Sequence, residues 1–107
     1  MNTNLSAEEQ QYYSRQIKLK EFGENRQRAL KNGSVLLVGL GGLGSPLALY
    51  LAGAGVGRIG ICEFDKIDIS NLHRQILYGK SSIGKNKLSV GIERLKDLNP
   101  YIKFEAH

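Results

Sequence analysis

The sequence has few of the residues that mark secreted, fibrous or disordered chains. Only one cysteine and two prolines occur among its 107 residues, and no low-complexity tract interrupts them. The single cysteine, Cys62, excludes an internal disulfide, and no Cys and His cluster offers the four ligands of a structural zinc. Collagen-like, mucin-like and linker classes are excluded as well. With 41% hydrophobic residues, the composition predicts one small domain that buries a core.

Long apolar runs are also missing. The longest stretch, residues 47–57, is broken by the hydroxyl of Tyr50 and falls short of the ~20 residues that a membrane-spanning helix requires. The N-terminus has neither the basic region nor the apolar stretch of a secretory signal. We therefore expect a cytoplasmic protein with no membrane partner.

Charge is the first positive indication of a partner. The chain carries 15 Lys plus Arg against 10 Asp plus Glu, for a net charge of +5. Such a balance favours anionic partners. Because the positive charges are spread along the chain without interleaved aromatic residues, they favour a phosphate-bearing small molecule over nucleic acid.

Two short helices are expected before the first apolar run. Ser6 and Glu9 have the spacing of a capping box, which predicts a helix over residues 7–15. A second, mostly polar helix is expected over residues 24–31, followed by a stop signal. We treat residues 1–33 as an N-terminal helical arm.

The remainder alternates between strand and helix patterns. The apolar run after Gly33 is typical of a strand buried on both faces of a parallel sheet. The segment that follows is rich in Leu and Ala, and its Pro46 is tolerable only in a first helical turn. The expected order is βαβαβ, with strands over 34–40, 58–64 and 101–105 and helices over 43–55 and 84–98.

This order predicts an α/β fold. Residues 34–107 would form a partial nucleotide-binding domain, a truncated Rossmann-like, doubly wound parallel sheet of about three strands. A complete domain of this type needs a fourth strand beside the first. The first strand is therefore expected to present an unpaired edge, which would make the chain marginally stable or prone to aggregation. These features predict an N-terminal fragment or a truncated gene product.

A glycine motif lies between the first expected strand and helix. Residues 39–44, Gly-Leu-Gly-Gly-Leu-Gly, satisfy G-x-G-x-x-G in the strand-to-helix context that gives this pattern its meaning. Gly39 allows the tight turn, Gly41 lets a phosphate approach the backbone, and Gly44 permits close packing of helix and sheet. Glu63 closes the second strand, where an acidic side chain would bind a ribose. The motif predicts a nucleotide site.

Polar residues further along the chain favour a triphosphate. The stretch of residues 70–75 places amides and the guanidinium of Arg74 just past the carboxyl edge of the sheet. Lys87 follows at the start of the next helix. Arg74 would bind phosphate oxygens as a fork and Lys87 as a point charge. Two cations suit a triphosphate better than a dinucleotide.

Five motifs in register resemble the ThiF/MoeB/HesA family of adenylating enzymes, which activate ubiquitin-like sulfur carriers. The resemblance spans about residues 6–100. The residues that carry it are Tyr13-Ser14-Arg15-Gln16-Ile17, the Gly39–Gly44 loop, Leu51-Ala52-Gly53-Ala54-Gly55-Val56-Gly57, Ser70-Asn71-Leu72-His73-Arg74-Gln75 with Asp65, and Gly84-Lys85-Asn86-Lys87.

The resemblance implies a reaction at the α-phosphate of ATP. The C-terminal glycine carboxylate of the carrier attacks, pyrophosphate leaves, and an acyl-adenylate forms with the help of cations and Mg²⁺. Arg15, Arg74 and Lys87 would be catalytic, and Arg15 would reach into a partner's site, which implies a homodimer. The residues implied in nucleotide binding are Gly39, Gly41, Gly42 and Gly44 at the loop, Glu63 and Asp65 at ribose or metal, and Asn71, Arg74, Gln75 and Lys87 at phosphates.

Some family features would lie outside this sequence. The Mg²⁺-binding aspartate, the zinc-binding cysteine pairs and the catalytic cysteine of the family would all follow His107. No zinc is therefore expected here, and the magnesium ligand of the family is expected outside this sequence. We expect Cys62 to be a small buried hydrophobe, His73 a surface or packing residue, and Asp68 the cap of a turn.

Two alternatives remain open. One is a non-catalytic module of the same family that binds nucleotide or dimerises without adenylation. The other is part of a nicotinamide-dependent dehydrogenase, which the glycine loop and Glu63 also permit. Arg74 and Lys87 distinguish the dehydrogenase from the ATP-dependent adenylyltransferase, because NAD binding gives these two residues no role.

Overall fold

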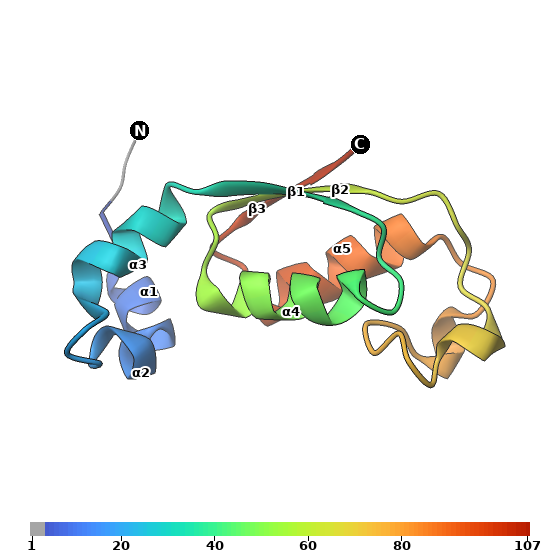
Figure 1. Cartoon of the computed structure of the whole chain (residues 1–107), viewed down its shortest axis with the longest axis horizontal. Helices are drawn as coiled ribbons and strands as arrows, with labels where there is room; N and C mark the ends of the chain where they lie inside the picture. Colours follow the sequence, from blue (N-terminus) through green and yellow to red (C-terminus); the bar gives the residue numbers. More distant parts are fainter. Residues whose placement is uncertain (1–3) are drawn as a thin grey trace.

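The computed structural model describes residues 4–107. Its centre is a three-stranded parallel sheet in the order β1-β2-β3 (Figure 1). The helix α4 connects β1 to β2, and the helix α5 lies between β2 and β3, so the expected Rossmann-like alternation is confirmed. The elements are β1 (Ser34–Val38), α4 (Gly44–Ala54), β2 (Arg58–Cys62), α5 (Lys87–Leu98) and β3 (Lys103–Ala106).

Three helices, not two, precede the sheet: α1 (Ala7–Tyr12), α2 (Ser14–Ile17) and α3 (Gly23–Lys31). The capping box of Ser6 and Glu9 starts α1 as expected. The prediction of one helix over residues 7–15 is wrong at Tyr13, where φ −94° and ψ 11° leave the helical region. This break turns the ring of Tyr13 into the protein, where it is 3% exposed.

Buried amides attach these helices to the sheet domain. The Nδ2 of Asn99 donates to the hydroxyl of Tyr13 and to the carbonyl of Ala52, each at 2.7 Å. The Nε2 of Gln27 donates to the carbonyl of Ala54 at 3.0 Å. Asn99 and Gln27 are both fully buried. The C-terminal end of α4 therefore receives hydrogen bonds from side chains of the arm and of the segment after α5.

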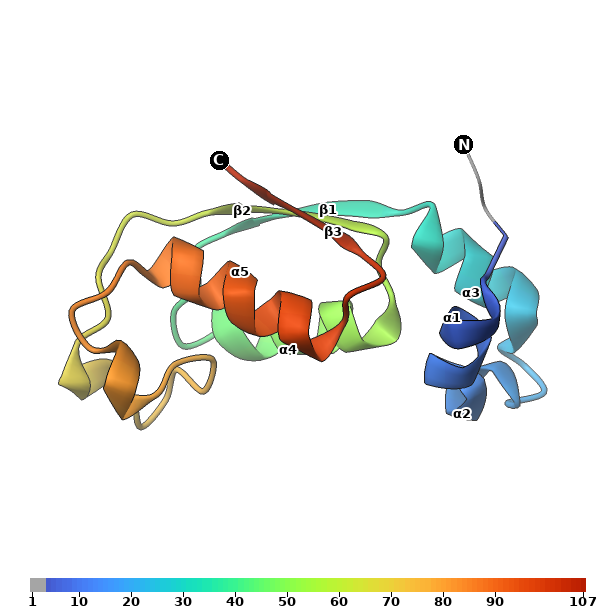
Figure 2. The ribbon, with the colours of Figure 1, turned by 180° about the vertical axis from the view of Figure 1, so that it is seen from behind.

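Both crossover helices lie on the same side of the sheet (Figures 1 and 2). The expectation that β1 is buried on both faces is therefore wrong. Leu37 is 7% exposed against the core, but its neighbours Leu36 and Val38 are 60% and 79% exposed. The core lies between the sheet and the two helices and consists mainly of Leu37, Leu40, Ala48, Ala52, Ile59, Ile61, Leu77, Leu95 and Phe104.

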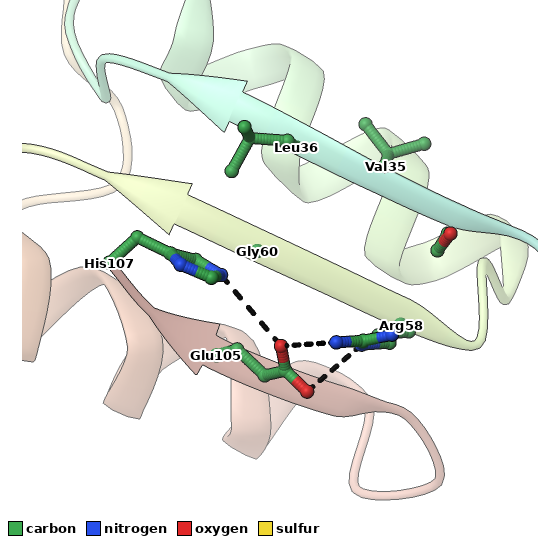
Figure 3. Close-up of a pocket in the computed structure, with 7 residues that line it drawn as sticks. Val35, Leu36, Arg58, Gly60, Glu105 and His107 are labelled. Atoms are coloured by element: carbon green, nitrogen blue, oxygen red, sulfur yellow. Dashed lines mark hydrogen bonds and ion pairs between the residues drawn. The ribbon is translucent and has the colours of Figure 1, made fainter.

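The uncovered face of the sheet carries a group of charged side chains (Figure 3). Arg58 donates to both carboxylate oxygens of Glu105, at 2.9 and 2.8 Å. The Nε2 of His107 lies 3.7 Å from the same carboxylate. These residues line a hollow of about 260 Å³.

Because β1 pairs only with β2 in the described chain, its other edge is unpaired, as expected.

Element boundaries differ from the expectation by a few residues. The first two strands end at Val38 and Cys62, because Gly39 turns with a φ of +95° and Glu63 bends to cap the glycine loop. Helix α5 begins at Lys87 rather than residue 84, since Asn86 accepts the amide of Leu88 as its N-cap. The last strand is Lys103–Ala106 instead of residues 101–105.

Cys62 is only partly buried at the end of β2. No helix among residues 4–107 is long and apolar enough to span a membrane.

The close contact between α3 and Gly57 leaves no room for a side chain at Gly57. A Cβ at this position would lie 1.8 Å from the carbonyl oxygen of Lys31, which belongs to the backbone of α3. We expect Gly57→Ala to lower the free energy of unfolding by at least about 2 kcal/mol, measured by urea denaturation. The matched control is Gly53→Ala, whose Cβ meets nothing within 4 Å and which should stabilise α4 by roughly 0.5–1 kcal/mol. Equal effects of the two changes would contradict this account.

The contact between α1 and α3 predicts a dependence on pH. Glu9 is 7% exposed, and its Oε1 accepts from Lys31 Nζ at 2.9 Å. Burial raises the pKa of Glu9, but the hydrogen bonds from Lys31 and Ser6 outweigh it, so the pKa lies below the ordinary 4.5. The ionised group therefore stabilises the fold above pH 4.5, and this contribution is lost as the pH falls through the lowered pKa.

We expect Glu9→Gln to lower the free energy of unfolding by about 1–2 kcal/mol at pH 7. The difference in unfolding free energy between this variant and the wild type should shrink as the pH falls below 4.5, because Glu9 then loses its charge. The exposed neighbour Glu8 offers a control, because Glu8→Gln removes the same charge from the same helix and should cost less than about 0.5 kcal/mol. A Glu9→Gln deficit that stayed constant down to strongly acidic pH would exclude the ion pair as its cause.

Candidate functional site

The glycine loop, residues 39–44, connects β1 to α4 at one end of the molecule. Gly39 has φ +95°, and its amide donates to the carbonyl of Cys62 at 2.8 Å. A Cβ on Gly44 would lie 2.1 Å from the carbonyl oxygen of Gly39. Only glycine permits this approach. The tight turn expected at Gly39 is observed, whereas Gly44 approaches the loop residue Gly39 rather than a strand of the sheet.

The first half of the loop is held at the peptide groups of Leu40. Its amide donates to the Oε1 of Glu63 at 2.7 Å. Its carbonyl accepts from the Oγ of Ser45 at 2.7 Å and from the hydroxyl of Tyr78 at 2.9 Å. The side chain of Leu40 is fully buried. Three separate segments therefore fix the position of this one residue.

The second half of the loop has unused donors. The amides of Gly41, Gly42 and Leu43 donate to no protein acceptor within residues 4–107. They stand at the start of the 11-residue helix α4, whose N-cap, Leu43, has no side chain able to accept a hydrogen bond. Free amides at the positive end of a helix dipole attract anions.

Glu63 leaves the end of β2 and places its carboxylate against the loop. Besides the Leu40 amide, it accepts the amides of Phe64 and Asp65 on Oε2, at 2.8 and 3.1 Å. Burial raises the pKa of Glu63, but these three backbone donors outweigh it, and the charge of Lys87 adds to them, so the pKa is lowered. A carboxylate has about four acceptor positions, so the ionised Glu63 retains about one for a ligand.

The segment after β2 brings further candidates to the loop. Asp68 caps the short 3-10 helix η1 (Ile69–Asn71) by accepting the amide of Ser70 at 2.9 Å, as expected. The Oδ1 of Asn71 returns the contact by accepting the amide of Asp68. The Nη1 of Arg74 donates to the carbonyl of Ser70 at 2.9 Å. Arg74 is thereby held without any carboxylate partner in the described chain.

Gln75 lies beside the loop with an unsatisfied group. It is 5% exposed, and its Nε2 is 3.7 Å from the point where a Cβ on Gly41 would stand. Its Oε1 is buried and has no hydrogen-bond partner among residues 4–107. The aliphatic part of Arg74 lies 3.9 Å from the corresponding point at Gly42. A buried orphan acceptor of this kind indicates that a donor belongs there.

Lys87 reaches the same region from the start of α5. Its amide donates to the carbonyl of Asp65 at 3.0 Å. The residue is 5% exposed, yet its ammonium forms no ion pair in the part of the chain described. The carboxylate of Asp65 is exposed and likewise makes no hydrogen bond with these residues. The cation of Lys87 is therefore available to an anionic ligand.

The remaining candidate, Arg15, is far from this site. It is exposed on α2, which lies at the opposite end of the molecule from the glycine loop (Figures 1 and 2). The long axis of the protein measures 42 Å. The structure thus brings Gly39–Gly44, Glu63, Arg74, Gln75 and Lys87 together and leaves Arg15 apart.

Two residues of the site were not predicted from the sequence. Ser45 and Tyr78 both donate to the carbonyl of Leu40, and neither belongs to the glycine pattern or to the cluster of charges. The available signal was weak, a hydroxyl immediately after the last loop glycine and a tyrosine among apolar residues. His73 is exposed, as expected. Within residues 4–107, no three His, Cys, Asp or Glu side chains gather as a metal site would require.

Curated relatives share this sequence over nearly its whole length. The chain is 49% identical over 105 residues to the adenylyltransferase and sulfurtransferase MOCS3 of Anopheles gambiae, covering 98% of this chain and 24% of the relative. It is 47% identical over 100 residues to the sulfur carrier protein adenylyltransferase of Thermus thermophilus, covering 94% and 37%. The chain therefore spans about a quarter to two fifths of these relatives.

Solved structures share the fold. The E. coli tRNA N6-threonylcarbamoyladenosine dehydratase, TcdA, determined in complex with ATP, superposes with a TM-score of 0.90 at 28% identity, over 97% of this chain and 42% of that one. E. coli MccB superposes with a TM-score of 0.83 at 34% identity, over 98% and 30%. The ThiF family matches residues 13–107. With the glycine loop and its surrounding charges in place, this match establishes that the chain belongs to the ThiF family.

Proposed function

We propose that this chain forms the ATP-binding part of an adenylyltransferase that activates the C-terminal glycine of a ubiquitin-like sulfur-carrier protein. One observation carries the proposal: three free loop amides lie at the same end of the sheet as an ammonium and a guanidinium that have no anionic partner within residues 4–107. Relatives that act as adenylyltransferases and a similar structure that binds ATP support it.

The phosphates are assigned to the positive side of the site. The amides of Gly41, Gly42 and Leu43 would bind phosphate oxygens at the start of α4. Arg74 would add a planar fork, and Lys87 a point charge. Gly39 and Gly44 contribute by shaping the loop.

The nucleoside is assigned to the acceptors of the site. The acceptor position that remains on Glu63 suits a single ribose hydroxyl. Asp65 would add a second, exposed carboxylate. Gln75 is assigned to the phosphates instead: its Nε2 lies beside Gly41 and would donate to their oxygens, and its buried Oε1 requires a donor of its own. The side chain of Asn71 keeps its Nδ2 available because only Oδ1 serves the cap.

The reaction needs positioning and neutralisation of charge more than a protein nucleophile. A carboxylate oxygen of the carrier's C-terminal glycine attacks the α-phosphorus, the bond to the bridging oxygen breaks, and pyrophosphate leaves with the electron pair. The product is an acyl-adenylate. The loop amides, Arg74 and Lys87 would stabilise the charge that develops on the phosphate oxygens.

Magnesium, which the family resemblance implies, would neutralise phosphate charge further when bound. The described residues do not supply a set of ligands for it, since no group of three acidic, His or Cys side chains gathers in residues 4–107. Asp65 and Glu63 alone do not make a metal site. The charge neutralisation proposed here therefore rests on the chain's own amides and cations.

We also propose a homodimer in which Arg15 completes a neighbouring site. Arg15 is exposed, has no ion pair with the described residues, and lies on α2, away from the loop of its own chain. An arginine so placed reaches phosphate only on a second copy. Two-fold symmetry would then form two equivalent composite sites.

A non-catalytic nucleotide-binding module of the family is the second candidate, because the chain spans only part of its relatives. Pyrophosphate exchange into ATP in the presence of the carrier distinguishes the two functions. Binding of ATP without exchange would favour the second candidate. The nicotinamide alternative has lost its support, since the family match accounts for the glycine loop.

Charge removal at the phosphate side tests the site. We expect Arg74→Ala and Lys87→Ala each to weaken ATP binding by about tenfold or more, because each removes a charge-assisted bond, and to leave adenosine binding unchanged. Isothermal titration calorimetry of the purified chain measures both. Lys96→Ala removes an exposed cation from the last turn of α5 and serves as the control. Unchanged ATP affinity in both variants would refute the assignment.

Mixing two inactive variants tests the shared site. Arg15→Ala and Lys87→Ala should each abolish carrier-dependent pyrophosphate exchange. In an equimolar mixture that has exchanged subunits, half of the dimers would be mixed and would contain one intact site each. The mixture should therefore recover about a quarter of the wild-type rate. No recovery, with subunit exchange confirmed by mass spectrometry, would show that Arg15 does not act on a partner's site.

A further inference from the structure

The hydroxyl of Tyr78 connects two parts of the site that approach each other from different elements. It donates to the carbonyl of Leu40 at 2.9 Å. Within the described residues, this is the one hydrogen bond between the 71–78 segment, which carries Arg74 and Gln75, and the glycine loop. The polar contact between phosphate-binding side chains and phosphate-binding amides thus depends on one oxygen atom.

The segment is compact enough to transmit that contact. The amides of Arg74 and Gln75 donate to the carbonyl of Asn71 at 3.1 and 2.8 Å, and the amide of Tyr78 donates to the carbonyl of Gln75 at 3.2 Å. These bonds link residues 71–78 through successive turns. A shift of the Tyr78 hydroxyl therefore moves Arg74 and Gln75 relative to the loop.

The rest of Tyr78 is fixed in the core. The residue is 7% exposed, and its ring and the side chain of Leu77 both lie close to Gly91 of α5. Ring packing holds the segment against α5, and the hydroxyl is the part that points to the loop. Burial raises the pKa of Tyr78, and the nearby carboxylate of Glu63 raises it further. The hydroxyl consequently keeps its proton and remains a donor.

We infer that Tyr78 is a positioning residue for phosphate recognition: its hydroxyl docks the 71–78 segment on Leu40, so that Arg74 and Gln75 stand beside the free amides of Gly41 and Gly42. The inference rests on the proposed ATP site. It assigns to Tyr78 no contact with the nucleotide and no chemical step.

The test is Tyr78→Phe, which removes one oxygen atom and keeps the ring. Calorimetry with magnesium ATP should show about a fivefold loss of ATP affinity. Calorimetry with adenosine should show an affinity unchanged within about twofold, because Arg74 is proposed to contact the phosphates that adenosine lacks. A residue that only stabilised the fold would affect both ligands alike. Tyr12→Phe is the control, because it also removes one tyrosine hydroxyl, the donor to the carbonyl of Leu98, but belongs to α1 and not to the site. It should leave the ratio of the two affinities unchanged within about twofold.

A double variant completes the test. In an Arg74→Ala background, Tyr78→Phe should cause a smaller loss of ATP affinity than in the wild type, because one of the two side chains that it positions is already gone. The inference is overturned if the losses add in full, if ATP and adenosine lose affinity equally, or if Tyr12→Phe lowers the ratio as much. Failure of Tyr78→Phe to fold would also overturn it, since the hydroxyl would then serve the fold. Absence of ATP binding by the wild type would refute the proposed function itself.

Discussion

The approach of Gly44 to the carbonyl of Gly39 is the constraint on which the rest of the site depends. The point where a Cβ would stand is 2.1 Å from that oxygen, so the turn from β1 into α4 closes only with glycine. Closure at this distance places Leu40 within reach of Glu63, Ser45 and Tyr78. It also leaves the next three amides without acceptors in the described chain. The geometry of one turn thus sets both the anchored half and the free half of the loop.

The same end of the sheet carries an acidic and a basic side chain, Glu63 and Lys87, that do not form an ion pair with each other. Glu63 is held by backbone amides, and Lys87 is buried nearby but does not contact it. Direct pairing would cancel the charge of Lys87 and leave it unavailable to a ligand. Because amides satisfy the carboxylate instead, the ammonium keeps its attraction for phosphate.

Much of the fold and part of the site could be predicted from the sequence. The parallel strands, the helix after the glycine motif and the capping of Ser6 and Asp68 follow from local patterns that do not depend on distant contacts. The break at Tyr13 could not be predicted, because the side chain that holds its hydroxyl, Asn99, lies 86 residues away in the sequence. Ser45 and Tyr78 were missed for the same reason: their partner is a backbone carbonyl, which leaves no trace in residue types. The uncovered face of β1 was mispredicted because apolar residues reveal hydrophobicity but not which elements cover them.

The helices of this protein differ in how they begin. Ser6 closes the start of α1, and Asn86 closes the start of α5, each with a side-chain oxygen. At the C-terminal end of α4, the carbonyls of Ala52 and Ala54 accept hydrogen bonds from buried side-chain amides. At its N-terminal end, the N-cap Leu43 has no side-chain acceptor for the amides of the first turn. A phosphate oxygen at that place would do for α4 what Ser6 does for α1 and Asn86 does for α5. The nucleotide proposed above would thus complete the hydrogen bonding of this helix, so that its binding would also stabilise α4.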